Sequence, residues 1–127
     1  IVSFVLAFAI AIPVGIKSAV NKYGKFDNFW TVFSLIGVGM PSFFFALLVI
    51  FFIALPFGLP LNSMRDPLKA ALGYSSVFEE ILDVAQHMLL PVLVLTILSL
   101  AGLIRYVRNS VIDVINQDYI RTARSKG

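Results

Sequence analysis

The sequence predicts an all-α membrane protein with three membrane-spanning helices, and three observations carry this prediction. Of the 127 residues, 59% are hydrophobic and 13% charged, with a mean hydropathy of +0.93. Soluble domains are about 45–50% apolar and roughly 25% charged. Three long stretches, 1–16, 28–64 and 88–104, contain no charged residue. The basic residues, finally, are distributed very unevenly around these stretches.

The lengths of the apolar stretches set the predicted spans. A helix needs about 20 apolar residues to cross the hydrocarbon of a bilayer, which places spans at about 1–19, 29–57 and 88–106. The first is interpreted as a transmembrane helix cut at its start rather than as a signal peptide. Its basic residues follow the apolar run, whereas those of a signal peptide precede it.

The distribution of lysine and arginine predicts the orientation. Eight of the ten lie in loop 17–28 or in tail 105–127, and only Arg65 and Lys69 lie in connection 58–87. By the positive-inside rule, the loop and the tail are cytoplasmic and the connection is external. The sequence pI near 9.5 is therefore attributed to membrane topology, and no nucleic-acid partner is expected.

The external connection carries signals for two helices. Asp66 followed by Pro67 predicts the start of a short helix, and Gly73 predicts its end. The S-x-x-E pattern from Ser76 to Glu79 is a capping box that opens a second, amphipathic helix at the outer membrane surface. A scaffold helix without contact to a transported solute is the favoured interpretation, and a solute contact is the alternative.

The first span contains a ladder of small residues. They recur every four positions: Ser3, Ala7, Ala11, Gly15 and Ala19. Lipid gives apolar helices no hydrophobic drive to pair, so helices associate by close packing, which small residues permit. We expect this face to contact another helix.

Proline marks two positions in the later spans. Pro41, after Gly39, removes a backbone hydrogen bond and predicts a kink in span 29–57. The kink either shapes a translocation path or serves packing alone, and the sequence favours neither. Pro91 is where the external helix is expected to run into the third span.

Polar and aromatic residues near the span ends have ordinary interpretations. His87, at the outer edge of the third span, is expected to be solvated or interfacial rather than a proton carrier. Trp30 and Tyr106 are expected to anchor the cytoplasmic ends of spans as interfacial aromatics. No Asp, Glu, Lys or Arg lies inside a span, which argues against an ion-coupled carrier.

Several chemical functions are not indicated. The chain has no cysteine and one histidine without a cluster of acidic partners, so no disulfide, thiol chemistry, metal site or cofactor is expected. A phosphate-binding G-x-x-x-x-G-K-[ST] loop is also missing from the sequence. We therefore do not expect an enzyme.

The tail carries the most specific motif, D-Y-I-R-T-A-R-S-K-G at 118–127. It resembles a cytoplasmic loop of the permease subunits of binding-protein-dependent ABC importers. The general pattern there is E-A-A-x-x-x-G, written D-Y-[IV]-R-T-A-R-A-K-G in the oligopeptide/dipeptide/nickel branch. Ser125 replaces an alanine of that branch, and Arg121 and Thr122 stand where the general pattern has Glu-Ala. Ala123 and Gly127 match.

Weaker similarities to the same branch occur in the same order along the chain, at 12–16, 41–43, 87–91 and 105–110. The resemblance implies that the three spans are helices two to four of a six-helix type I ABC-importer permease fold. By truncation, the chain then lacks the first helix and everything beyond Gly127.

The resemblance also implies the function. Tail 107–127 would hold a short coupling helix, a basic amphipathic knob ended by glycine that docks in a groove of an ATPase subunit. Its coupling residues would be Asp118, Tyr119, Arg121, Thr122, Ala123, Arg124, Lys126 and Gly127. Implied partners are a sister permease, two ATPase subunits that hydrolyse ATP and an external solute-binding protein, in a bacterial or archaeal cytoplasmic membrane.

The solute stays open, because peptide and nickel systems share these motifs. The alternative function is a membrane scaffold or signalling subunit whose basic tail binds a cytoplasmic partner or anionic lipid.

Overall fold

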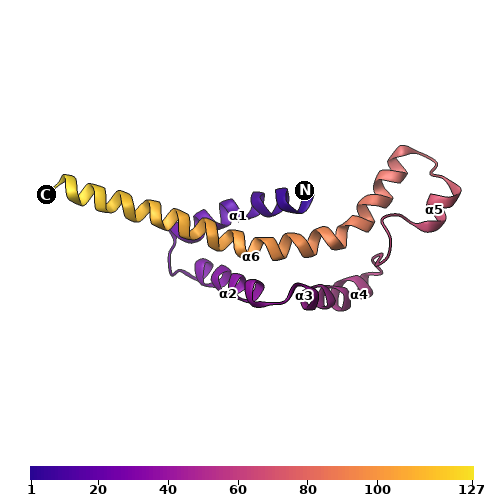
Figure 1. Ribbon diagram of the computed structural model, residues 1–127, viewed down its shortest axis with the longest axis horizontal. Coiled ribbons are helices and arrows are strands. Elements are labelled where there is room, and N and C mark those ends of the chain that lie inside the picture. The colour runs from indigo at the N-terminus through magenta and orange to yellow at the C-terminus, as the bar shows by residue number, and fades with distance from the viewer. The chain divides into compact units, whose positions relative to one another are not determined.

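The computed structural model describes all 127 residues, and its regular structure is entirely helical, which confirms the predicted all-α class (Figure 1). The elements are α1 (Val2–Val20), α2 (Lys25–Gly39), α3 (Ser42–Val49), the π-helical segment η1 (Ile50–Ala54), α4 (Leu55–Phe57), α5 (Pro67–Leu72) and α6 (Val77–Ser125). The chain divides into two compact units, Ile1–Met40 with Thr96–Gly127, and Pro41–Leu95. We call them unit 1 and unit 2.

Two helices, α1 and α6, are long and apolar enough to cross a membrane, and a third span results if Lys25–Gly39 and Ser42–Phe57 count as one bent pair. Large apolar side chains such as Phe4, Phe43 and Leu95 are exposed. Such a surface suits lipid tails or further helices, because lipid is as apolar as these side chains.

In unit 1, the small-residue ladder forms the buried face of α1, together with Ser18. Ala7 and Ala11 pack there against Leu100 and Ile104 of α6. The half-buried residues Val14, Trp30, Phe33 and Leu103 surround this core. The Thr96 hydroxyl of α6 donates to the Ser3 carbonyl at 3.4 Å. α6 therefore lies directly against α1.

Two glycines allow close approach to α6. A Cβ atom at Gly15 would lie 2.7 Å from the Cβ of Val107, and one at Gly37 would lie 2.4 Å from the Cβ of Ala101. Real Cβ contacts do not come this close, so neither position can accept a larger residue without movement. A Cβ at Gly39 would meet nothing within 4 Å. Gly37, rather than Gly39, is therefore the residue of α2 that allows close approach to α6.

At Pro41 the structure has a break, where the sequence predicted a kink within one span. α2 ends at Gly39, Met40 and Pro41 have extended ψ angles of 129° and 135°, and α3 begins at Ser42. Proline disfavours helical geometry in the residue before it and has no N–H of its own. Its carbonyl accepts from Phe45 N at 3.1 Å and so starts the next helix.

Unit 2 has its own apolar core. Val49, Ala54 and Leu90 are buried together, and the half-buried residues around them are Phe45, Ile50, Ile53, Leu59, Leu93 and Val94. The core thus joins α3 and η1 to the first half of α6. Pro91 lies inside α6 without a break, so the external helix and the third span are one element.

The tail is not a separate short helix. It is the last part of α6, which runs unbroken over 49 residues. The physical reason is local: residues 105–125 contain neither glycine nor proline, so nothing ends the helix before Ser125. The sequence predicted a span followed by a separate short coupling helix, whereas in the structure one helix continues from the span into the motif.

Candidate functional site

The motif residues lie together on the exposed end of α6. All eight predicted coupling residues, from Asp118 to Gly127, are exposed to solvent. Arg121, Arg124 and Lys126 form no ion pair within the chain. Their charges are consequently available to another molecule.

The end of the motif has the geometry that favours glycine. Gly127 has a φ of 91°, in the left-handed region, where side chains with a Cβ are strained. The Lys126 amide donates to the Thr122 carbonyl at 3.2 Å, and the Ser125 hydroxyl donates to the same carbonyl at 2.8 Å. A glycine that follows a helix in this conformation is a common C-terminal cap.

A buried ion pair holds α6 at Arg108, ahead of the exposed motif at 118–127. Arg108 Nε donates to Asp27 Oδ1 at 2.6 Å, and Arg108 Nη2 donates to Asp27 Oδ2 at 2.8 Å. The Asp27 side chain is 0% exposed and that of Arg108 is 18% exposed. A two-pronged guanidinium–carboxylate contact fixes both distance and orientation.

Asp27 collects further donors from α1 and from the α1–α2 loop. The Ser18 hydroxyl donates to Asp27 Oδ1, and the Tyr23 amide donates to Asp27 Oδ2 at 3.0 Å. Asp27 is also in the first turn of α2, where the helix dipole favours a negative charge. Chiefly the hydrogen bonds from Arg108 hold the pKa of Asp27 well below its usual range, against the opposing effect of burial.

The local sequence explains why these groups meet. Gly15 lets the backbone of α6 approach α1 at Val107 and Arg108, and Ser18 lies on the same face of α1 because residues three apart are neighbours on a helix. Tyr23, with a φ of 65°, turns the chain between the helices. Its amide then reaches the carboxylate of Asp27.

This pair was not predicted from the sequence. The available signal was that Asp27 is the one acidic residue in loop 17–28, which otherwise carries lysines. Its partner could not be identified from spacing, because Arg108 follows 81 residues later.

Beside the ion pair lies a cavity of about 280 Å³, lined by Ser18, Trp30, Thr31, Ser34, Leu35, Ile104, Arg105, Arg108 and Asn109. The buried Ser34 hydroxyl has no hydrogen-bond partner. Trp30 faces this interior and stacks edge-on with Phe33, with ring centroids 5.2 Å apart. Tyr106, in contrast, is 71% exposed.

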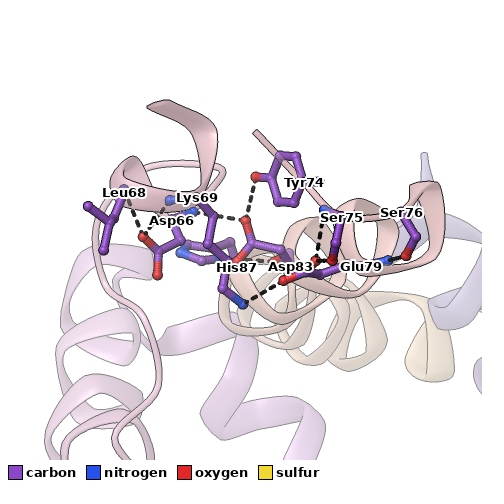
Figure 2. Close-up of polar contacts among 9 residues, drawn as sticks. All are labelled: Asp66, Leu68, Lys69, Tyr74, Ser75, Ser76, Glu79, Asp83 and His87. Carbon is purple, nitrogen blue, oxygen red and sulfur yellow. Dashed lines mark hydrogen bonds and ion pairs between the residues drawn. The ribbon is translucent and has the colours of Figure 1, made fainter. Parts of the chain in front are cut away.

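A second polar cluster lies in unit 2, in the connection predicted to be external (Figure 2). Asp83 Oδ2 accepts from the Asp66 amide at 2.9 Å and from the Tyr74 hydroxyl at 2.8 Å. His87 Nδ1 lies 3.3 Å from Asp83 Oδ1 and 2.8 Å from the Asp83 carbonyl. The His87 side chain is 9% exposed, so His87 is not the solvated histidine of one expectation, and its interfacial location stays a prediction. We call these four residues the Asp83 cluster.

The predicted helix caps of this connection are confirmed, with one change. Asp66 Oδ1 accepts from the Leu68 amide at 2.9 Å, and α5 ends at Leu72, before Gly73. The Ser76 hydroxyl accepts from the Glu79 amide at 3.2 Å. The Glu79 carboxylate reaches back to the Ser75 amide at 3.1 Å, not to that of Ser76.

Comparison with known proteins agrees with the family suggested by the motif. Residues 11–127 match the family described as "Binding-protein-dependent transport system inner membrane component". The chain is 39% identical over 127 residues to the oligopeptide transport system permease protein AppB of Bacillus subtilis, covering 100% of this chain and 38% of that protein. It is 32% identical over 139 residues to the dipeptide transport system permease protein DppB of Escherichia coli, covering 98% of this chain and 41% of that protein.

The inner membrane ABC transporter permease protein YejB of Escherichia coli O157:H7 is 34% identical over 125 residues, or 98% of this chain and 34% of that protein. The chain thus spans about two fifths of the length of these relatives. With its apolar helices and this match, it is a membrane-embedded protein and a component of a transporter. It belongs to the family of binding-protein-dependent transport system inner membrane components.

Proposed function

We propose that the chain is part of a permease subunit for ATP-driven uptake of peptides or related small solutes, and that its tail is the ATPase-coupling segment. The observation that carries the proposal is the exposed motif at 118–127. The helix that bears it is held to the rest of unit 1 by the ion pair of Arg108 and forms no ion pair after that residue. Relatives named as oligopeptide and dipeptide permeases support the solute class.

The tail suits docking to a soluble partner. Its end is a rigid helix with three unpaired basic side chains and a glycine in the left-handed conformation. A helix of this kind can seat in a groove of a partner. The partner is an ATPase subunit, one of two that hydrolyse ATP in place of this chain, and their closure displaces the tail and shifts the spans between inward- and outward-open states.

The complete assembly also includes a sister permease and an external solute-binding protein, in a bacterial or archaeal cytoplasmic membrane. Loop 17–28 and the tail are cytoplasmic, and connection 58–87 is external, because eight of ten basic residues lie on the first side.

The orientation has a direct test. The chain has no cysteine, so Lys22→Cys and Asp66→Cys each introduce a single reactive thiol. We expect an impermeant thiol reagent to label position 66 in intact cells and position 22 only after the membrane is opened. Labelling of position 22 but not 66 in intact cells contradicts the orientation.

The coupling role is tested by the substitution Ala123→Glu in the full-length protein. We expect loss of solute uptake and of ATPase co-purification, because a larger charged side chain obstructs docking, while the binding protein keeps its affinity for solute. Gly127→Asp is expected to act in the same way, because its left-handed backbone strains any residue with a Cβ.

Asn116→Glu is the matched control. It adds the same charge two helical turns earlier on the same face, outside the motif, and should keep ATPase co-purification. The alternative, a scaffold with a lipid-binding tail, predicts the reverse pattern. In that case Ala123→Glu keeps uptake, while neutralising Arg121, Arg124 and Lys126 together removes the tail from vesicles of anionic lipid.

A further inference from the structure

The Asp27–Arg108 ion pair stands at the boundary between the packed and the free part of α6. Up to Val107, α6 lies against Gly15 of α1. Beyond Asn109, no hydrogen bond or ion pair joins α6 to α1 or α2, and from Asn116 onward every residue is exposed. The pair is therefore the last polar contact that α6 makes with α1 or α2 before the motif at 118–127.

Apart from the hydrogen bond from Thr96 to the Ser3 carbonyl, the other contacts between α1 and α6 are apolar. Small residues and aliphatic side chains join α1 to α6, and such faces tolerate small sliding or rotation, as packed helices do in shear motions. A two-pronged contact between Arg108 and Asp27 has a fixed distance and a fixed orientation. It resists the sliding that the apolar contact tolerates.

The pair also connects three helices and the loop between two of them. Asp27 belongs to α2, its donor Ser18 to α1 and its donor Tyr23 to the loop between them, while Arg108 belongs to α6. A displacement of α6 at Arg108 is thus applied directly to both neighbouring helices.

We infer that Asp27 and Arg108 are positioning residues of the transport cycle, which lock the tail helix to α1 and α2 so that a displacement of the tail moves all three helices together. This inference rests on the proposed function, because it requires that the tail be displaced. It adds a specific link that the motif at 118–127 does not contain.

The test uses the full-length transporter, with its ATPase subunits and binding protein, reconstituted in lipid vesicles. The readouts are solute molecules taken up per ATP hydrolysed, and co-purification of the ATPase subunits. Arg108→Lys keeps the positive charge but loses the fork that holds both carboxylate oxygens. We expect uptake per ATP to fall at least tenfold with ATPase co-purification retained.

Two further variants keep the inference testable if single changes impair assembly. The double variant Asp27→Asn with Arg108→Gln leaves no buried charge unpaired, so it should assemble. Its solute uptake per ATP should nevertheless stay as low as that of Arg108→Lys. Arg105→Lys is the matched control one turn earlier, where the arginine has no ion pair, and it should keep normal uptake per ATP.

Normal uptake per ATP in the double variant or in Arg108→Lys overturns the inference, since the fixed contact is then not needed. An equal loss in Arg105→Lys also overturns it. Its failure is distinguishable from failure of the proposed function: Ala123→Glu disrupts ATPase association if the tail is the coupling segment, whatever the outcome for Asp27 and Arg108.

Discussion

Units 1 and 2 each contain one carboxylate that is almost entirely buried and accepts several hydrogen bonds, yet the two carboxylates join different parts of the chain. Asp27 is 0% exposed, and its charged partner Arg108 lies 81 residues away. Asp83 is 4% exposed, and its partners Asp66 and Tyr74 lie 17 and 9 residues away. The first ties distant helices together, whereas the second folds one short segment.

The partners differ in charge as well as in distance. Asp27 is matched by a guanidinium in a two-pronged contact. Asp83 is satisfied mainly by neutral donors, a backbone amide and a tyrosine hydroxyl, and the first of these holds the pKa of Asp83 below its usual range. Removing a partner therefore leaves an uncompensated buried charge in unit 1, but mostly a missing hydrogen bond in unit 2.

The largest effect is expected for Arg108→Ala, which strands the buried carboxylate of Asp27. Breaking a buried ion pair from one side costs about 3–5 kcal/mol. We expect this loss in the free energy of unfolding of the full-length protein, measured in detergent micelles. Arg105→Ala is the control, because an exposed side chain without a partner should change the same quantity by no more than about 0.5 kcal/mol. If both substitutions lower the free energy of unfolding equally, the Asp27–Arg108 pair is not the charged long-range contact that sets unit 1 apart from unit 2.

The next effect concerns the helix packing on which the long-range contact depends. Ala11→Leu inserts a large side chain at a position with 0% exposure, and overpacking of this kind costs about 1–3 kcal/mol. We expect lower yields of the assembled transporter and weaker ATPase co-purification. Ile10→Leu, at a side chain that is 40% exposed, is the matched control with little volume change. Equal yields for both variants would indicate that this face of α1 does not hold the assembly together.

The two regions also differ in how far the sequence alone could predict them. The caps at Asp66 and Ser76 follow from local spacing, since a side chain caps an amide two or three residues away. The ladder of α1 was predictable for the same reason, because residues four apart share a helix face. Both features need only neighbours along the chain.

Features that depend on tertiary arrangement were not predictable in this way. The partner of Asp27 depends on how α6 lies against α2. Gly37 and Gly39 differ by two residues, and only the rotation of α2 decides which of them meets Ala101. Proline at 41 predicted a disturbance, but not whether the helix would bend or stop there. The continuity of α6, in contrast, has a local cause, the lack of glycine and proline in 105–125, but a search for motifs does not register a missing stop signal.

The smallest expected effect concerns the pKa of Tyr74, which tests whether the Asp83 cluster acts only on its own segment. Burial first, and then the hydrogen bond that its hydroxyl donates to Asp83, raise the pKa of Tyr74 from 10.0 to about 12. Because the folded-state pKa is the higher one, the contribution of Tyr74 to stability is fully present below pH 10 and is lost as the pH rises through about 12. Titration of tyrosinate absorbance should therefore show one late step that Tyr74→Phe removes.

Asp83→Asn separates the two causes of this shift in one further titration. The amide keeps a carbonyl acceptor for the Tyr74 hydroxyl but carries no negative charge, so the late step should move toward the ordinary tyrosine value while burial preserves part of the shift. The ion pair of unit 1 should be insensitive to this change, so solute uptake per ATP hydrolysed, which is expected to fall when that pair is lost, serves as the control. If Asp83→Asn leaves the late step in place and instead lowers uptake per ATP, the Asp83 cluster does not act locally, and the contrast between Asp27 and Asp83 fails.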